Sequence, residues 1–207
     1  MRGSLLILVL FILCCFANGQ EWKVRKHQNT RYYAIITRNA EKTPFKYTEV
    51  SELSENKAYV AKGDLYAYIN YDLKEISPYL FVEASNFKNG YAIVGDSFGR
   101  SIINSRIQLV IPFMFQEVRL PVDGLIVVQS WQNTWGVYDV YGNEKLPLIY
   151  DLPPKIINRD KIIVRKADAY GVVNDCNEII FPLGYQFIDV NGMGYKQGNY
   201  LRLFNPN

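Results

Sequence analysis

Five prolines recur at a nearly constant interval, and this interval constrains the fold more than any other feature of the chain. They stand 34, 34, 35 and 35 residues apart, at Pro44, Pro78, Pro112, Pro147 and Pro182. Three residues after each proline comes an aromatic residue: Tyr47, Phe81, Phe115, Tyr150 and Tyr185. Several columns that agree at one period indicate tandem structural repeats.

Three more columns show what each unit consists of. Twelve residues before the prolines stand Tyr32, Tyr66, Arg100, Trp135 and Tyr170, of which four are aromatic. The next position is mostly small, with Tyr33, Ala67, Ser101, Gly136 and Gly171. Four residues after the first column, four of the five residues are Asn or Asp: Ile36, Asn70, Asn104, Asp139 and Asn174.

Each column has a structural meaning. The alternation over Val137, Tyr138 and Asp139 predicts a short strand with one buried face. An Asn or Asp followed three residues later by Gly142 or Asn177 predicts a turn, because such residues tolerate positive φ. The apolar runs that end at Pro112 and Pro182 predict a second strand, with the proline at a strand end, an edge or a bulge. Each unit is therefore expected to be a hairpin followed by a loop.

This pattern resembles the WG-repeat family, also called KWG repeats. The family unit is roughly Trp-Gly-aromatic/aliphatic-Ile-Asp-x-x-Gly-x-x-Ile-Pro-x-x-Tyr. Residues 135–150 and 170–185 match it best and residues 66–81 match well. Residues 32–47 and 100–115 keep the Pro-x-x-aromatic end but lose the aromatic-Gly start or the turn residues. The resemblance covers nearly all of the chain after residue 19. It implies a structural or binding repeat without a common set of catalytic residues.

Residues 1–19 have the pattern of a secretory signal peptide. Arg2 precedes a continuous apolar run over residues 5–16, and Ala17-Asn18-Gly19 supplies small residues before the expected cleavage point. The run is shorter than the roughly 20 residues that span a bilayer, so no integral membrane span is expected. A lipoprotein signal ending at Cys14 or Cys15 is the alternative, although the small residue required before the cysteine is missing.

Cleavage after Gly19 leaves 22 basic and 20 acidic side chains, a formal charge of +2, and Cys176 as the single thiol. An exported chain with one cysteine forms no internal disulfide, so packing alone must hold its core together. The near-neutral balance argues against nucleic acid or an anionic membrane as the main partner.

The leading strand of each unit is also visible. An opening strand is expected over Trp22–Lys26, and later ones over residues 58–61, 91–94, 125–129 and 161–165, each introduced by Asn56, Gly90, Gly124 or Asp160. Gly198-Asn199 introduces residues 200–204, which are expected to form a closing cap. No capped amphipathic helix is present, so the chain is predicted to be all-β.

Residues 20–207 are expected to form one WG-repeat-like domain of about five units plus the C-terminal capping strand. Neighbouring hairpins must stack to bury their faces. We expect an open solenoid or superhelical array, because 34–35 residues are few for a propeller blade of about 40 residues. A closed propeller-like ring is the alternative.

The sequence gives little support to catalysis. His27 is the only histidine, so a histidine-based triad or metal site would depend on it. Cys176 lies in a predicted turn. Glu49, Glu83 and Glu117 follow the repeat and are expected to be structural or solvated, as is the basic cluster of Lys23, Arg25, Lys26 and Arg31; an anionic ligand is the alternative for that cluster. No catalytic residue, cofactor or metal ligand is predicted.

Aromatic side chains are the better candidates for function. Trp131, Trp135, Tyr138 and Tyr141 are crowded into one hairpin. Trp135 belongs to the first column and is expected to pack in the core. Trp131 and Tyr141 lie outside the repeat columns described above. They are the candidate partner-binding residues, because exposed aromatic rings suit both sugars and protein interfaces.

The sequence therefore predicts an exported, non-catalytic binding or scaffolding module. Its expected partner is a protein or a cell-envelope glycan, and its expected location is the periplasm, the cell surface or the medium. Two alternatives from other classes remain: a carbohydrate-active hydrolase that uses a carboxylate pair, and a structural protein that associates with itself.

Overall fold

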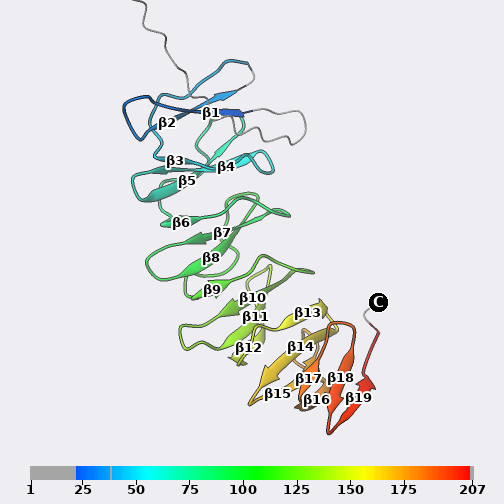
Figure 1. Cartoon of the computed structure of the whole chain (residues 1–207). Coiled ribbons are helices and arrows are strands. Elements are labelled where there is room, and N and C mark those ends of the chain that lie inside the picture. The colour runs from blue at the N-terminus through cyan, green and yellow to red at the C-terminus, as the bar shows by residue number, and fades with distance from the viewer. Residues whose placement is uncertain (1–21, 38, 206–207) are drawn as a thin grey trace, which may run out of the picture. The chain divides into compact units, whose positions relative to one another are not determined.

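The computed structural model describes residues 22–37 and 39–205. The predicted signal peptide, residues 1–19, lies outside the described residues. Nineteen strands and no helix occur in the described ranges, which confirms the all-β class (Figure 1). The contacts divide the chain into two compact units, Met1–Gly90 and Tyr91–Asn207, and each is described separately. The prediction of one continuous repeat domain stays a prediction.

Unit 1 begins with the antiparallel pair β1 (Trp22–Lys26) and β2 (Tyr33–Thr37). A three-stranded sheet follows, in the order β3 (Glu49–Val50), β4 (Lys57–Lys62) and β5 (Leu65–Asn70). The short strand β6 (Glu83–Ala84) comes last. Apolar side chains from the first two repeats form one core cluster, which includes Ile35, Tyr47, Val60 and Ile69.

Unit 2 begins with the antiparallel pair β7 (Tyr91–Gly95) and β8 (Arg100–Asn104). The next sheet has the order β12 (Glu144–Tyr150), β11 (Trp135–Asp139), β10 (Leu125–Gln129) and β9 (Glu117–Val118). A second four-stranded sheet contains β13 (Lys155–Asn158), β14 (Lys161–Lys166), β15 (Ala169–Val173) and β16 (Ile179–Tyr185). The last sheet contains β17 (Phe187–Ile188), β18 (Met193–Lys196) and β19 (Asn199–Arg202).

The predicted leading strands are present, but the repeat contains more than a hairpin. Residues 58–61, 91–94, 125–129 and 161–165 all lie within strands. The expected loop is partly a strand, because β3, β9, β13 and β17 each pair with the leading strand of their sheet. The recurring Glu49, Glu83 and Glu117 are the first residues of short strands, which explains their register.

The expected second strands form unequally. The apolar run before Pro182 lies in β16 as predicted, whereas the run before Pro112 makes only an isolated bridge, between Ile103 and Leu109. Pro147 and Pro182 lie in β12 and β16, which are edge strands with register shifts. This placement matches the expectation, since proline cannot donate to the ladder and is tolerated at edges and bulges.

The first repeat is displaced by one residue from the predicted alignment. In the best-matching unit, Trp135 pairs with Tyr150. In the first repeat, the residue that pairs with Tyr47 in the same way is Tyr33 and not Tyr32. The small position of this repeat is therefore Ala34, and Tyr32 is exposed. The prediction failed here because the segment between the two bridged residues is one residue shorter than in the other repeats.

The Asn or Asp side chains of the repeat stabilise the turn that follows the second strand of each hairpin. In unit 2, the Asp139 Oδ1 atom accepts hydrogen bonds from the backbone N–H groups of Tyr141 and Asn143, both at 2.9 Å. Asn104 and Asn174 make the same pair of contacts in their own turns. The third residue after this column has positive φ, with 88° at Gly142 and 61° at Asn177, as predicted.

The same turn in the preceding repeat places Ile107 at a φ of 62°. This left-handed conformation is unfavourable for a β-branched residue and costs about 1–2 kcal/mol. We expect Ile107→Asn to raise the free energy of unfolding by about 1 kcal/mol, since asparagine tolerates this conformation. Urea unfolding measures the change, with Arg106→Asn as the control at an exposed neighbour. A lower midpoint for Ile107→Asn would contradict the assignment of strain to this residue.

The aromatic column after the prolines supplies much of the core. Tyr47 and Phe115 have no exposed surface, and Phe81 and Tyr150 are also buried, whereas Tyr185 is half-buried. Trp135 is 6% exposed and packs in the cluster formed by β10, β11, β12, β14 and β15, so the expectation that it packs in the core is confirmed. The Arg119 guanidinium lies 4.9 Å from its ring centre and covers it from outside.

A carboxylate in unit 1 joins two repeats. The Glu75 Oε1 atom accepts hydrogen bonds from Lys46 at 2.9 Å, from Lys62 at 3.1 Å and from the Tyr79 hydroxyl at 3.1 Å. Burial alone would raise the pKa of Glu75, but the hydrogen bonds from the two lysines outweigh it and lower the pKa to about 2.

This lowered pKa predicts sensitivity to acid. A carboxyl group with a depressed folded pKa contributes stability above its unfolded pKa of about 4.3, and this contribution disappears as the pH falls toward about 2. Glu75→Gln should therefore flatten the decline in stability between about pH 4.5 and pH 2. Urea midpoints measured across this range test the prediction, and parallel curves for the two proteins would refute it.

Candidate functional site

The two predicted partner-binding residues are both exposed, but the structure separates them. Trp131 is 59% exposed in the turn before β11, and Tyr141 is 83% exposed in the turn after it. A strand of five residues holds its ends about 16 Å apart. The two rings therefore lie at opposite ends of β11 and do not form one surface.

The Trp131 turn is held by side-chain hydrogen bonds. The Ser130 hydroxyl oxygen accepts hydrogen bonds from the backbone N–H groups of Gln132 at 3.3 Å and Thr134 at 3.2 Å. It also lies 2.7 Å from the Thr134 hydroxyl. The backbone of this turn is therefore fixed from within, and the indole of Trp131 is presented on an ordered support.

A second aromatic side chain lies in the corresponding turn of the preceding repeat. Phe98, between β7 and β8, is 73% exposed. The Asp96 Oδ1 atom accepts hydrogen bonds from the backbone N–H groups of Phe98 at 2.7 Å and Gly99 at 3.1 Å. The Asp96 side chain thus fixes the backbone of this turn, as the Ser130 side chain fixes the backbone of the turn in the next repeat.

Backbone contacts bring these two turns to the same edge of unit 2. The Arg100 N–H donates to the Phe115 carbonyl at 2.8 Å, and Gly99 lies directly against the backbone of Met114 and Phe115. The Gln116 N–H in turn donates to the Gln129 carbonyl at 2.9 Å, two residues before Trp131. The segment 114–116 therefore lies between the turns.

Met114 belongs to the segment between the two turns, and 48% of its surface is exposed. We call the exposed side chains of Phe98, Met114 and Trp131 the aromatic edge. Polar groups flank them: Arg119 pairs with Glu117 at 3.1 Å, and an Arg100 guanidinium nitrogen donates to the Gln116 carbonyl at 3.1 Å. An apolar centre with a polar rim is the usual composition of a protein interface.

Sequence reasoning missed Phe98 and Met114. Phe98 belongs to the repeat in which Arg100 replaces the first-column aromatic, and that repeat was aligned only by its proline end. An aromatic residue inside the turn sequence Asp96-Ser97-Phe98-Gly99 was the available signal. Met114 had none, because apolar residues such as Leu80 and Ile149 also stand exposed between the proline and the aromatic in other repeats.

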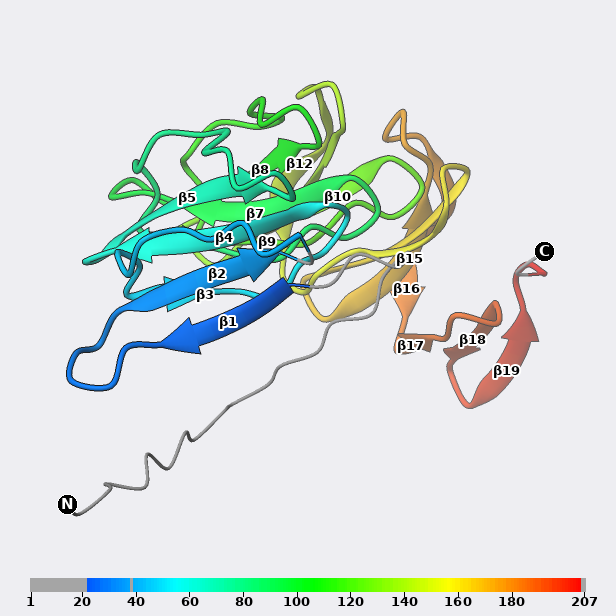
Figure 2. The same cartoon turned by 90° about the horizontal axis from the view of Figure 1, so that it is seen from above.

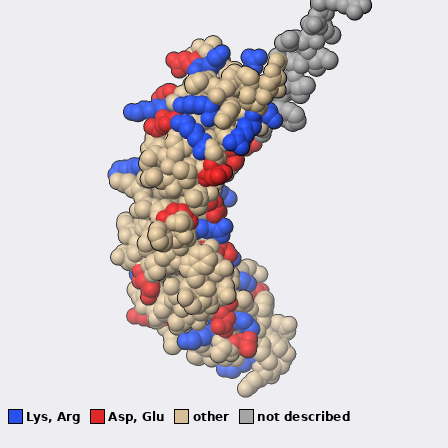
Figure 3. All heavy atoms as spheres, turned by 90° about the vertical axis from the view of Figure 1, so that its left-hand side faces the viewer, with Lys and Arg blue, Asp and Glu red and all other residues tan. Residues whose placement is uncertain are grey.

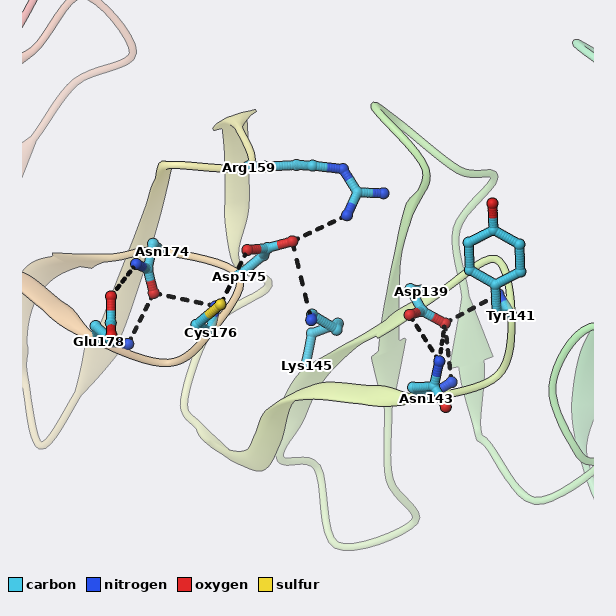
Figure 4. Close-up of polar contacts among 9 residues, drawn as sticks. All are labelled: Asp139, Tyr141, Asn143, Lys145, Arg159, Asn174, Asp175, Cys176 and Glu178. Carbon is cyan, nitrogen blue, oxygen red and sulfur yellow. Dashed lines mark hydrogen bonds and ion pairs between the residues drawn. The ribbon is translucent and has the colours of Figure 1, made fainter.

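Tyr141 lies at the opposite end of β11, in the turn closed by Asp139 (Figure 4). Burial would raise the pKa of Asp139, but hydrogen bonds from Asn143 and the Tyr141 N–H lower it. A carboxylate that stays ionised and is saturated by its own turn is suited to closing the turn. This buried acid is therefore not arranged as a proton donor to a sugar.

The next repeat places Cys176 in the equivalent turn, as predicted (Figure 4). It is exposed, and its thiol lies 3.6 Å from the Asp175 Oδ1 atom. The other carboxylate oxygen of Asp175 accepts a hydrogen bond from Arg159 at 2.9 Å and lies 4.0 Å from the Lys145 Nζ atom. These groups satisfy one another and link β12 to the turns around β14 and β15.

The remaining sequence candidates contact residues near them in unit 1. The His27 ring packs edge-on against Phe45, and its Nδ1 accepts a hydrogen bond from the Asn29 N–H. A depression in unit 1 is lined by Trp22, Tyr33 and Glu49 among others, but Glu49 is exposed and accepts a hydrogen bond from the Tyr66 hydroxyl. Within the described ranges, no three His, Cys, Asp or Glu side chains are grouped to hold a metal ion.

The basic cluster occupies the first hairpin. Lys23, Arg25 and Lys26 on β1 are exposed, as is Arg31 in the following turn. Figure 3 shows lysine and arginine side chains gathered at the upper end of the view, where unit 1 lies, with acidic side chains interspersed. The Lys26 Nζ atom lies 6.0 Å from the centre of the Tyr33 ring. This arrangement agrees with a solvated outer hairpin.

The WG containing repeat family matches this chain at residues 41–66 and 66–95. Residues 41–95 therefore contain WG repeats, as the sequence pattern predicts. The matched residues do not include 135–185, which come closest to the family pattern by inspection. A comparison with curated proteins found no similar sequence.

Solved structures with a similar fold are distant. The chain is 12% identical to Kluyveromyces lactis Hsv2 with its complete loop 6CD, with a TM-score of 0.42 over 84% of this chain and 68% of that one. BamB from Moraxella catarrhalis gives 9% identity and a TM-score of 0.42, over 88% and 70%. The WD40 beta propeller domain of Doa1 gives 10% and 0.38, over 78% and 64%.

The chain spans 65% of the length of the Hsv2 form whose loop 6CD is replaced by a Gly-Ser linker, which is less than two thirds. TM-scores at this level do not decide between an open array and a closed ring, so the open array stays a prediction. No helix long and apolar enough to cross a bilayer occurs in the described part of the chain.

Proposed function

We propose that this WG-repeat chain is an exported, non-catalytic binding module, and that its aromatic edge contacts a protein partner. The observation that carries the proposal is the grouping of Phe98, Met114 and Trp131, all 48% exposed or more, on turns fixed by Asp96 and Ser130. Such side chains are costly to leave in water unless another surface covers them.

The composition of the edge favours a protein over a glycan. Aromatic residues and methionine are enriched at protein interfaces, and rigid aromatic side chains lose little entropy on binding. A sugar requires hydrogen-bonding groups beside the ring that stacks on it, since its hydroxyls lose water on binding. Phe98 and Met114 offer none, and the flanking Glu117 and Arg119 are already paired with each other.

Export is the second part of the proposal, and it depends on the pattern of residues 1–19. The protein recovered from outside the producing cell should begin at Gln20, which would be cyclised to pyroglutamate. Mass spectrometry of the intact secreted chain measures this directly. A product that retains residues 1–19, or one that remains inside the cell, would refute export and leave the binding proposal to be tested separately.

The binding proposal is tested by affinity capture with three forms of the tagged protein. The wild type is compared with Phe98→Ser/Trp131→Ser, which removes both rings of the edge, and with Tyr141→Ser, which removes an exposed ring at the other end of β11. We expect one protein to be recovered by the wild type and by Tyr141→Ser, and to be lost with the double variant. All three substitutions are at exposed sites and should leave the unfolding midpoint unchanged.

Three outcomes would contradict the proposal. Recovery that survives the double variant would remove the aromatic edge from the binding site. Loss with Tyr141→Ser alone would place the site on the opposite turn. Selective retention of a cell-envelope glycan, with no protein, would replace the protein partner with a sugar.

A further inference from the structure

The two rings of the aromatic edge project from two sheets that are stacked face to face. Side chains of β8 and β10, such as Ile102 and Ile126, pack in one core cluster, so these two sheets face each other. Figure 1 shows the hairpins β7–β8 and β10–β11 as successive layers, and Figure 2, seen from above, shows β7 and β10 close together. Facing sheets pack about 10 Å apart. The turns that carry Phe98 and Trp131 therefore follow each other at this spacing.

The backbone of the two turns is engaged within the turns themselves. The Asp96 carboxylate accepts hydrogen bonds from the N–H groups of Phe98 and Gly99, and the Ser130 hydroxyl accepts two from the Trp131 turn. A partner that adds a strand to a sheet needs a row of free backbone groups on an extended segment. These closed turns do not supply such a row, so a partner must be bound through the side chains of the edge.

Trp131 adds one polar group to these side chains. Its indole N–H is a donor with no acceptor capacity, and it makes no hydrogen bond among the described residues. A partner that covers the ring must supply an acceptor, because burying an unpaired donor is destabilising. An α-helix uses its backbone carbonyls in its own hydrogen bonds, whereas a polyproline II segment has no internal hydrogen bonds and leaves its carbonyls free.

The repeat of a polyproline II segment also matches the spacing of the turns. This helix completes one turn in three residues and about 9 Å, so every third side chain lies on the same face at nearly the distance between facing sheets. Side chains on one face of a β-strand recur at about 7 Å, which does not fit. Proline-rich segments also bind surfaces lined with aromatic rings, since their conformation is formed in advance.

We propose that the aromatic edge binds a proline-rich segment of the partner protein in the polyproline II conformation. Prolines three residues apart contact the rings of Phe98 and Trp131, and the residues between these prolines contact Met114. A backbone carbonyl of the segment accepts a hydrogen bond from the Trp131 Nε1–H group. This inference names the chemistry of the partner at the aromatic edge, so it rests on the proposed function.

The test uses the purified protein and synthetic peptides. The probe is fluorescein-labelled decaproline, which is polyproline II throughout. A Gly-Ser peptide of the same length is the flexible control, and a peptide of Glu-Ala-Ala-Ala-Lys repeats is the helical control. Binding is measured by fluorescence anisotropy. The indole N–H signals of the three tryptophans are followed by NMR during the titration with decaproline.

We expect decaproline to bind equally to the wild type and to Tyr141→Ser, and at least about tenfold more weakly to Phe98→Ser/Trp131→Ser. Trp131→Phe keeps a ring and removes the N–H, so binding should weaken about twofold to tenfold, the usual effect of one hydrogen bond. Only the indole signal of Trp131 should move, because Trp22 and Trp135 are buried. Neither control peptide should bind comparably. Unchanged urea midpoints would show that the variants are folded.

Other results would overturn the inference. Equal binding of decaproline to the wild type and to the double variant would place the peptide away from the aromatic edge. Tighter binding of the helical peptide, or equal binding of the Gly-Ser peptide, would exclude polyproline II as the recognised conformation. Full binding to Trp131→Phe, with an unmoved indole signal in the wild type, would remove the hydrogen bond.

Absence of decaproline binding at millimolar concentration would also overturn it, and the capture experiment shows how far such a failure extends. If the double variant still loses the captured protein, the proposed function stands and only the proline chemistry fails. If capture does not depend on the double variant either, the aromatic edge is not a binding site.

Discussion

Phe115→Ala is expected to lower the free energy of unfolding by about 3–5 kcal/mol. The ring has no exposed surface, belongs to the cluster that contains Ile102 and Ile126, and meets Tyr138 edge to face at 5.2 Å. Its removal loses buried apolar contact and leaves a cavity among strands that cannot collapse onto it. Total stabilities of about 5–15 kcal/mol make this a large fraction of the whole.

Urea unfolding followed by tyrosine and tryptophan fluorescence measures the effect, and Met114→Ala is the matched control. Met114 adjoins Phe115 in the chain but is exposed, so its truncation should change stability by no more than about 0.5 kcal/mol. Equal losses for the two variants would show that the aromatic after the proline does not hold the repeat together.

Gly136→Ala is expected to destabilise the protein by about 1–3 kcal/mol, and Gly136→Val by more. A Cβ atom at this position would stand 2.7 Å from the Leu146 carbonyl oxygen and 3.0 Å from that of Pro147. Both oxygens belong to the backbone of β12, so the strand itself would have to move. The next repeat has the same crowding at Gly171, where a Cβ atom would stand 2.9 Å from the Phe181 carbonyl oxygen.

The comparison for this variant is Ala67→Gly, at the same position in unit 1. No complete third strand follows β5 there, and an alanine is accommodated. Its loss should cost no more than about 1 kcal/mol, the usual penalty for glycine within a strand. A Gly136→Ala protein that is as stable as the wild type would contradict the close approach of β11 and β12.

The repeat period and the turn chemistry explain why much of the fold was predictable. Each repeat has the same local backbone conformation, and this conformation requires particular residue types. The residues concerned are the proline, the aromatic three residues later and the Asn or Asp of the turn. The shift of one residue at Tyr33 was not predictable, since it depends on a shorter segment before Tyr47 that only the pairing reveals. The short strands at Glu49 and Glu117 were missed because two residues give no periodic signal.

The candidate site was only partly visible in the sequence. Trp131 and Tyr141 are both exposed, since neither fills a column that packs between repeats, and their partner-binding role stays a prediction. Their separation by the length of β11 follows from which turn each occupies, and it removes them from a common surface. The turns of Phe98 and Trp131 are brought to the same edge by backbone hydrogen bonds of Phe115 and Gln116. These hydrogen bonds connect different repeats, so the sequence of one repeat does not predict them.

Site-specific photo-crosslinking tests the central claim, that the aromatic edge contacts a protein. Benzoylphenylalanine is placed at position 98, at position 131 or at position 141, and the protein is irradiated with the material from which it would capture its partner. We expect positions 98 and 131 to cross-link to the same protein and position 141 not to do so. A cross-link from position 141 alone, or different proteins from positions 98 and 131, would contradict it.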